Sequence, residues 1–224
     1  MLFKDRTAAG QLLAGQLTAY ANRPDVLVLA LPRGGVPVAF EVGKALNAPL
    51  DVVLVSKLGV PGHKELAIGA LASGGVRVIN REVVRAHHLF EAAIHQVVVR
   101  EQRELERWER LYRDDRPAPD LFGRTLILVD DGLATGATLR AAVIAIRQQE
   151  PARIVVAVPI SSPETCHEIE AEVDEFICAM TPRPFYSVNF WYENFSETTD
   201  EEVCDLLQRA ANNHQPPATS GQRR

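Results

Sequence analysis

The chain has 224 residues, of which 46% are hydrophobic and 24% are charged, and its formal net charge is −5 at pH 7. This composition suits one globular domain with a sizeable core, or a domain plus a subdomain. The negative balance argues against broad binding to nucleic acid or to anionic membranes. The three cysteines fit no zinc or redox spacing, no apolar run approaches a membrane span of about 20 residues, and no signal peptide is seen. We therefore expect a cytoplasmic protein.

The first part of the chain predicts a strand–helix–strand unit. Thr7 is a candidate cap for a helix of about 15 residues. Residues 26–31, VLVLAL, form a continuous apolar run, as in a strand that is covered on both faces. The turn PRGG follows, a helix is predicted over about 36–46, and a second strand over 50–58. This order forms a βαβ unit and implies a parallel sheet.

The middle of the chain breaks that alternation. Residues 59–65, GVPGHKE, have no periodicity and are interpreted as a mobile loop. Residues 66–80 predict two short strands joined at 73–75, and Asn80 can cap a short helix. A longer helix is predicted over about 90–113, with an apolar stripe that we expect to pack on a partner chain, as in a homodimer, or over the hood. The stripe consists of Ile94, Val98, Leu105, Trp108 and Tyr112.

The second half returns to alternating strands and helices. We therefore predict one doubly wound α/β domain over residues 1–212, with a mostly parallel sheet flanked by helices. Within it we expect a helical insertion at about 81–115 and hood elements at about 182–196. Residues 213–224 are polar and proline-containing and are predicted to be disordered. The predicted strands are 125–130, 153–158 and 174–179, and the predicted helices are 138–149, 163–171 and one from about 199.

The segment 126–139, LILVDDGLATGATL, carries the strongest functional signal. Its apolar strand runs directly into Asp130 and Asp131. In a doubly wound sheet, ligands bind at the carboxyl ends of the strands. Carboxylates accept hydrogen bonds, so an adjacent pair suits vicinal hydroxyl groups such as those of a ribose.

The small residues after the acid pair lead into a helix N-terminus. Free backbone N–H groups and the helix dipole favour an anion at that place. Gly132 and Gly136 allow close backbone approach, and Thr135 and Thr138 add hydroxyl donors. The combination indicates a ribose that carries a 5′-phosphate. The alternatives are an acidic strand end beside a capped helix, and a general nucleotide loop, which the absence of G-x-G-x-x-G and of a P-loop lysine disfavours.

The motif LVDDGLATGAT closely resembles the 5-phosphoribosyl-1-pyrophosphate (PRPP) motif of the type I phosphoribosyltransferases. The chain up to about residue 210 is also similar to a bacterial branch of this family, in LPRGGVPVA, KLGVPGHKELAIGA and FYSVNFWYENFSETTDEEV. The resemblance implies a parallel sheet flanked by helices, with a hood over the site. It also implies that Mg²⁺ binds together with PRPP.

The resemblance further implies a role for each matching residue. Asp130 and Asp131 would bind the ribose hydroxyl groups, and would contact Mg²⁺ only indirectly, through PRPP or water. Lys57, at the strand end before a flexible catalytic loop, and Lys64, on that loop, would stabilise the departing pyrophosphate; the alternative is a pair of solvated lysines. The 5′-phosphate would be held by Ala134, Thr135, Gly136, Ala137 and Thr138, and the diphosphate by Arg33, Gly34 and Gly35, for which a plain β–α turn is the alternative.

The aromatic stretch PFYSVNFWYENF is a candidate surface for an acceptor base. Flat rings stack on aromatic side chains, although a satisfied hydrophobic core would use the same residues. No pair of residues identifies a particular purine or pyrimidine. The candidate stacking residues are Phe185, Tyr186, Phe190, Trp191 and Tyr192.

Three functions compete. The leading hypothesis is an enzyme that transfers the 5-phosphoribosyl group of PRPP to a nitrogen nucleophile, with a nucleobase as the expected acceptor. The second is a regulatory protein that senses PRPP without turnover, because fold does not fix function. The third, a phosphosugar hydrolase, lacks an obvious activated nucleophile. The expected ligands are small molecules, with neither nucleic acid nor a membrane as partner.

Overall fold

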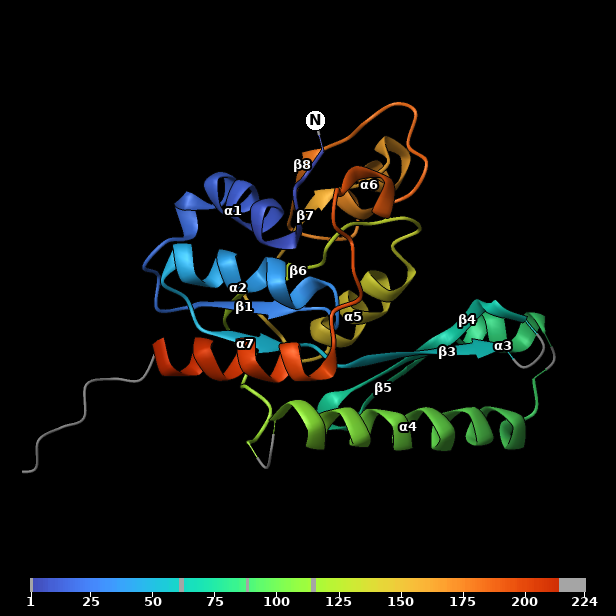
Figure 1. Ribbon diagram of the computed structural model, residues 1–224. Helices are drawn as coiled ribbons and strands as arrows, with labels where there is room; N and C mark the ends of the chain where they lie inside the picture. Colours follow the sequence, from blue (N-terminus) through green and yellow to red (C-terminus); the bar gives the residue numbers. More distant parts are fainter. Residues whose placement is uncertain (1, 61–62, 88, 114–115, 214–224) are drawn as a thin grey trace, which may run out of the picture.

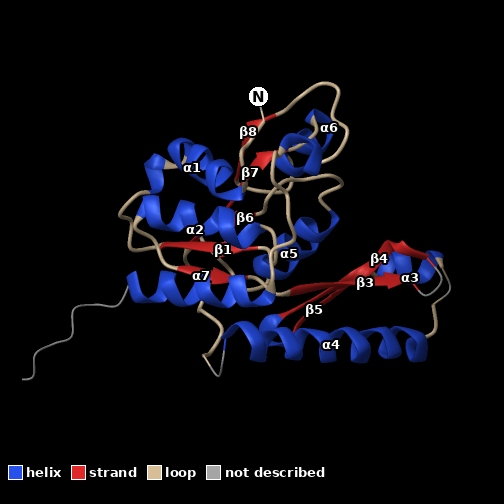
Figure 2. Cartoon of the chain, in the orientation of Figure 1, coloured by secondary structure: helices blue, strands red, loops and turns tan. Residues whose placement is uncertain are grey.

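The computed structural model describes residues 2–60, 63–87, 89–113 and 116–213. Its centre is a five-stranded sheet in the order β2-β1-β6-β7-β8, in which every neighbouring pair is parallel (Figures 1 and 2). The predicted doubly wound α/β fold is confirmed. The strands are β1 (Val26–Ala30), β2 (Leu50–Val52), β6 (Thr125–Val129), β7 (Arg153–Ile160) and β8 (Glu175–Met180).

Helices cover both faces of this sheet. Successive residues of β1 point to opposite sides, so Val28 belongs to one buried cluster and Leu29 to another. The cluster around Val28 includes side chains from α1, α2 and α7, and the cluster around Leu29 includes those from α5. The helices are α1 (Arg6–Gln16), α2 (Gly35–Leu46), α5 (Ala137–Arg147), α6 (Pro163–Glu170) and α7 (Asp200–Asn213).

A second, three-stranded antiparallel sheet projects from the core as an arm (Figure 1). The helix α4 lies along it, and its apolar stripe packs on the sheet of its own chain. Ile94 and Val98 share a cluster with Leu58 and Ile68. The prediction that this stripe packs on a partner chain or over the hood is therefore wrong. The arm consists of β3 (Val55–Val60), β4 (His63–Ala72), β5 (Val76–Ile79), α3 (Arg81–Ala86) and α4 (Glu91–Arg113).

The single strand predicted over 50–58 is also wrong, because the chain leaves the central sheet after Val52 and starts the arm at Val55. The loop predicted over 59–65 is largely strand, since β3 ends at residue 60 and β4 begins at 63; residues 61–62 lie outside the described residues. The pairing of β3 with β4 shifts register around Gly59, which explains the lost periodicity. The two strands predicted over 66–80 are confirmed.

The caps of two helices test the predicted starts. The Ala8 N–H donates to Asp5 Oδ1 at 2.8 Å, so Asp5 caps α1 and the Thr7 prediction is wrong. The prediction for Asn80 is confirmed, because the Val83 N–H donates to Asn80 Oδ1 at 3.2 Å.

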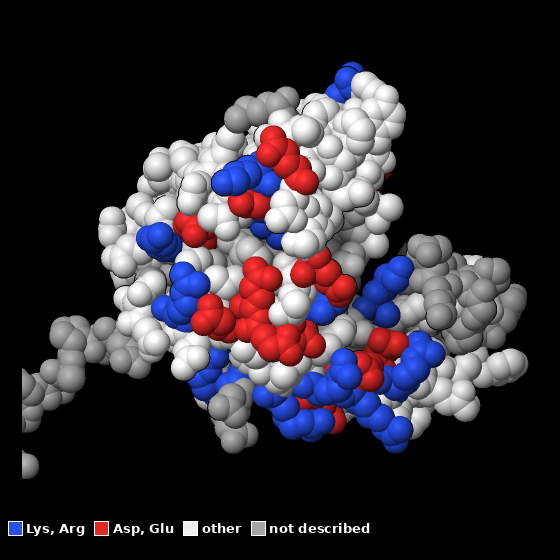
Figure 3. Space-filling view, viewed as in Figure 1, with Lys and Arg blue, Asp and Glu red and all other residues white. Residues whose placement is uncertain are grey.

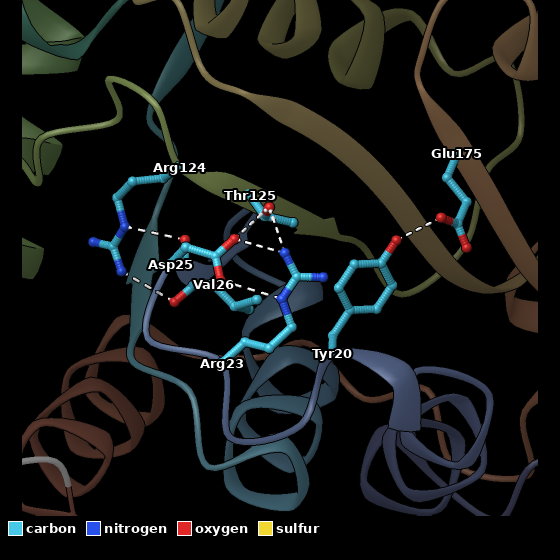
Figure 4. Close-up of polar contacts among 7 residues, drawn as sticks. All are labelled: Tyr20, Arg23, Asp25, Val26, Arg124, Thr125 and Glu175. Atoms are coloured by element: carbon cyan, nitrogen blue, oxygen red, sulfur yellow. Dashed lines mark hydrogen bonds and ion pairs between the residues drawn. The ribbon is translucent and has the colours of Figure 1, made fainter.

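A polar network closes the amino ends of the strands (Figure 4). Asp25 accepts hydrogen bonds from Arg23 Nη2 at 2.7 Å and from Thr125 Oγ1 at 2.8 Å. These two donors lower the pKa of Asp25 to about 2. Tyr20 donates to Glu175 at 2.5 Å on the same edge. Side-chain hydrogen bonds thus occupy this edge, whereas doubly wound sheets bind ligands at the carboxyl edge.

Candidate phosphoribosyl site

The acid pair and the PRGG turn meet at the carboxyl ends of β6 and β1. These two strands are hydrogen-bonded neighbours, and the strand order reverses between them, which is where doubly wound sheets bind ligands. A Cβ on Gly34 would stand 2.1 Å from Asp131 Oδ2, and one on Gly35 would stand 2.8 Å from Val129 O, the backbone oxygen just before the acid pair. Both distances are too short for a real Cβ contact. The turn therefore requires glycine because it rests directly on the acid pair.

The two carboxyl groups are electrostatically strained. The Asp131 N–H donates to Asp130 Oδ1 at 2.8 Å. Burial, followed by the neighbouring Asp131 charge, raises the pKa of Asp130 well above its ordinary value. Burial also raises the pKa of Asp131, although Arg6 opposes this shift. Hydroxyl donors from a ligand would relieve the strain by stabilising the charged forms.

Arg6, which the sequence analysis did not select, is part of this site. Its Nε donates to Asp131 Oδ2 at 2.8 Å, and only 12% of the Arg6 side chain and 14% of the Asp131 side chain are exposed. Its Nη1 donates to Ser196 O at 2.6 Å, and its guanidinium carbon lies 3.9 Å from the Phe195 ring centre. Arg6 thus joins the acid pair to the segment after β8. No motif marks this single arginine, which precedes Asp131 by 125 positions.

The loop after the acid pair leads into helix α5, whose N-terminus has no side-chain cap. Gly136 adopts a left-handed φ of 68° at the N-cap of α5, and no side chain caps that helix. The first N–H groups of a helix have no partner within it. Thr135 and Thr138 are both exposed beside this terminus. The residues predicted to hold a phosphate therefore lie together, with donors that face solvent.

Helix α6 holds the outer wall of this loop. Thr165 Oγ1 donates to Ala134 O at 2.7 Å. The Leu133 N–H donates to Ile160 O at 2.9 Å, which ties the loop to the end of β7. The loop is therefore fixed at two points before the helix begins, and Ala137 is the first residue of α5.

The side chain of Arg33 points towards the start of α7. It pairs with Glu197, and its Nη1 lies 3.9 Å from Asp200 Oδ1. Gly34 and Gly35 thus contact the acid pair while Arg33 lies beside α7. Of the three residues predicted to bind the diphosphate, the two glycines therefore lie against the acid pair, and the Arg33 guanidinium is paired with Glu197 and Asp200.

The two predicted catalytic lysines lie in the arm. Lys57 is in β3, half-buried, and pairs across the ladder with Ala70. Val55 and Ala70 belong to the cluster around α5, whereas Ser56 donates to Glu101 of α4 at 2.6 Å. By alternation, Lys57 shares the face that packs on α5. Lys64 is in β4, and its side chain lies outside what the structure describes.

The predicted stacking residues are divided between core and surface. Tyr192 is buried against Phe3 and Phe195, and its hydroxyl donates to Asp131 O at 2.6 Å. Its ring faces are occupied, so Tyr192 supports the acid pair and offers no stacking surface. Tyr186 and Phe190 are exposed, with ring centres 5.1 Å apart. Of the other two candidates, Trp191 contacts Phe190 edge-on, and Phe185 packs partly against the same cluster as Tyr192.

The described residues contain no group of three or more His, Cys, Asp or Glu side chains able to hold a metal ion. The acid pair alone offers too few ligands for Mg²⁺, which prefers six oxygens and keeps several waters. Asp130 and Asp131 fit a magnesium ion that is bound mainly by ligand oxygens and water. Within the same described part of the chain, no helix is both long and apolar enough to span a membrane.

The fold is that of a doubly wound α/β protein with an acid pair and an uncapped helix N-terminus at the switch point of its sheet. Residues 4–181 match the family model for the phosphoribosyl transferase domain. The chain therefore belongs to the phosphoribosyl transferase family, and the predicted family is confirmed.

Two curated proteins and one solved structure are similar to most of the chain. The proteins named "Putative phosphoribosyl transferase" from two Mycobacterium tuberculosis strains, CDC 1551 / Oshkosh and ATCC 25618 / H37Rv, are 46% identical over 209 residues. The match covers 93% of this chain but 47% of each relative, so the chain spans about half their length. The crystal structure of TT1426 from Thermus thermophilus is 40% identical, with a TM-score of 0.85 over 93% of this chain and 99% of that one.

Proposed function

We propose that the chain binds PRPP together with Mg²⁺ and transfers the 5-phosphoribosyl group to a nitrogen nucleophile, most simply a nucleobase, in the cytoplasm. The observation that carries this proposal is the acid pair beneath the glycine turn, next to the uncapped start of α5. One edge of the sheet thus offers acceptors for two hydroxyl groups and donors for a phosphate. This combination matches the two ends of a ribose 5-phosphate.

In the proposed reaction, the nitrogen lone pair forms a bond to ribose C1 while the bond from C1 to the diphosphate oxygen breaks. The configuration at C1 inverts, pyrophosphate leaves with the electron pair, and the acceptor nitrogen loses its proton to solvent. Asp130 and Asp131 hold the ribose hydroxyl groups, and Thr135 to Thr138 hold the 5′-phosphate. The protein contributes mainly positioning and electrostatic stabilisation.

Positive charge is needed where the diphosphate leaves. Arg33 can supply it, and Lys57 and Lys64 are candidates from the arm. Asp130 and Asp131 would hold Mg²⁺ through water and ligand oxygens, and the ion supplies further positive charge at the diphosphate. The exposed pair Tyr186 and Phe190 is the proposed stacking surface for a flat acceptor.

The test is a panel of nucleobases and small amines, incubated with PRPP and Mg²⁺, with pyrophosphate release as the readout. The Asp130→Asn, Asp131→Asn double variant serves as the blank. Acceptor-dependent release that the double variant loses supports the transferase. Tight PRPP binding without release for any acceptor would favour the PRPP sensor instead, and release that the double variant retains would remove the site assignment.

A further inference from the structure

Two of the three cysteines, to which the sequence spacing gave no role, meet where α6 packs on β8. Cys166 lies in α6 and Cys178 in β8, and both thiols are partly buried. Cys178 packs against the cluster that contains Ile169, whereas its neighbour Ile177 packs against the cluster on the other face of the sheet. Cys166 lies one turn before Ile169 on the same side of α6. The two thiols are in hydrogen-bond contact with each other.

The helix that carries Cys166 also supports the proposed phosphate loop. Thr165, the residue before Cys166, donates from Oγ1 to Ala134 O at 2.7 Å. A Cβ on Gly136, at the N-cap of α5, would stand 3.1 Å from Ile169 Cδ1 and 3.5 Å from Thr165 Cγ2. Helix α6 therefore packs closely on the residues that shape the loop, and a displacement of α6 moves them.

A bond between the two sulfurs would require such a displacement. In the reduced pair, Cys178 Sγ donates to Met180 O at 3.2 Å. Bond formation removes this hydrogen and brings the sulfurs from hydrogen-bond contact to about 2.05 Å. The ladder with β7 fixes β8 in the central sheet, whereas α6 has eight residues and an exposed outer face. The helix is therefore the element that shifts.

We propose that Cys166 and Cys178 form a reversible disulfide, and that this bond displaces α6 and weakens the binding of a phosphate by the loop before α5. The inference rests on the proposed function, because it assigns a redox regulation to the same phosphate site. In reducing compartments, disulfides are usually transient and serve catalysis or redox sensing. The pair is thus a modification site whose state is read out at the loop.

The chemistry is two successive thiol–disulfide exchanges, with glutathione disulfide as the oxidant. The Cys166 thiolate attacks one sulfur of glutathione disulfide, forms a mixed disulfide and releases one glutathione. The Cys178 thiolate then attacks the Cys166 sulfur and releases the second glutathione. The two thiol protons pass to the two glutathione thiolates, so two protein thiols are oxidised while one glutathione disulfide is reduced. Burial, followed by the neighbouring Cys166, raises the pKa of Cys178, so Cys178 acts as the second nucleophile.

Mass spectrometry after incubation with glutathione disulfide tests the bond. The product should be two hydrogen atoms lighter than the reduced protein, and digestion should yield one species that joins the peptides of Cys166 and Cys178. Dithiothreitol should restore the original mass. Cys166→Ser and Cys178→Ser should each abolish the link.

The third cysteine provides the control, since Cys204→Ser should still form the link. Cys204 lies on α7, over which Figure 3 shows acidic side chains gathered. Burial, followed by Asp200 and Glu201, raises the pKa of Cys204. Because glutathione disulfide is itself anionic, Cys204 should stay unmodified in the wild type.

Two measurements test the effect on the loop: titration calorimetry with ribose 5-phosphate, and amide hydrogen exchange of residues 132–138. On oxidation, the affinity for ribose 5-phosphate should fall by about tenfold, since small displacements of positioning groups are costly. Exchange in the loop should accelerate, and dithiothreitol should reverse both changes. Cys166→Ser should bind ribose 5-phosphate like the reduced wild type, with or without glutathione disulfide.

The outcomes separate this inference from the proposed function. The inference is overturned if no link between the two peptides forms, if only mixed disulfides with glutathione accumulate, or if the linked protein binds ribose 5-phosphate as tightly as the reduced protein does. If the reduced wild type fails to bind ribose 5-phosphate, the proposed function fails instead. Loop exchange then decides, because acceleration in the linked protein supports the disulfide switch and unchanged exchange overturns it.

Discussion

Gly34 and Asp131 are in direct contact: a Cβ on Gly34 would lie 2.1 Å from Asp131 Oδ2 and 2.8 Å from its carboxyl carbon. The turn after β1 and the acid pair after β6 are therefore one unit, although they lie far apart in the chain. The absence of a side chain at Gly34 is what lets the turn rest on the carboxylate.

The first prediction follows from this contact. Gly34→Ala should push the turn and the Asp131 carboxylate apart. Because a displaced carboxylate no longer meets the ribose hydroxyl groups in the right geometry, ribose 5-phosphate binding should weaken by at least about tenfold. Gly15→Ala is the control, because a Cβ there meets nothing within 4 Å and alanine favours a helix. Calorimetric titration of both variants measures the difference, and a Gly34→Ala protein that binds like Gly15→Ala would refute the contact's importance.

The second prediction concerns stability and pH. Burial raises the pKa of Asp130 above 3.8, so the folded state holds its proton more tightly than the unfolded state does. The contribution of this group to stability is full below pH 3.8 and is lost as the pH rises through the folded-state pKa. Asp130→Asn should therefore raise the free energy of unfolding at neutral pH.

Urea unfolding of wild type and Asp130→Asn over a series of pH values measures this effect. The advantage of the variant should shrink as the pH falls towards 3.8. Asp25→Asn is the matched control with the opposite sign, because its two donors lower the pKa of Asp25. A neutral-pH loss of stability in Asp130→Asn would contradict the burial argument.

The third prediction concerns Arg6. Arg6→Gln leaves Asp131 largely buried without its cation, so the free energy of unfolding should fall by about 3 kcal/mol. Arg209→Gln should cost less than about 1 kcal/mol, although Arg209 also pairs with a carboxylate and lies over a ring, because that pair is exposed. Equal losses in the two variants, measured by urea unfolding, would show that Arg6 has no special role.

Arg6 also shows where sequence reasoning ended. The strand, the acid pair and the small-residue loop could be predicted, because buried parallel strands are continuously apolar and phosphate loops need small residues. Arg6 reaches Asp131 only through the packing of α1 beside the sheet, which no local pattern encodes. The same holds for Tyr192, whose aromatic character suggested stacking but whose hydroxyl supports the acid pair.

The start of the arm could not be predicted from the sequence either. Residues 50–58, LDVVLVSKL, are mostly apolar, and no turn residue marks the point where the chain leaves the central sheet. That break depends on tertiary packing, since β3 lies between α4 and α5 while β2 pairs with β1. The placement of Lys57 on a strand followed from this packing, and its catalytic role stays a prediction.

The fourth prediction tests the phosphate loop. Thr138→Val removes an exposed hydroxyl at the start of α5 and should weaken ribose 5-phosphate binding by about tenfold, whereas Thr138→Ser should bind like wild type. Competition of ribose 5-phosphate against PRPP gives the comparison. Valine and serine variants that compete equally well would mean that the hydroxyl of Thr138 does not contact the ligand.

The most direct test of the phosphoribosyl site is calorimetric titration of PRPP and Mg²⁺ into wild type and into the Asp130→Asn, Asp131→Asn double variant. The wild type should bind, and the double variant should stay folded but lose about 1.5–3 kcal/mol of binding free energy for each charged hydrogen bond removed. Unchanged PRPP affinity in a folded double variant would contradict the assignment of the acid pair to the ribose.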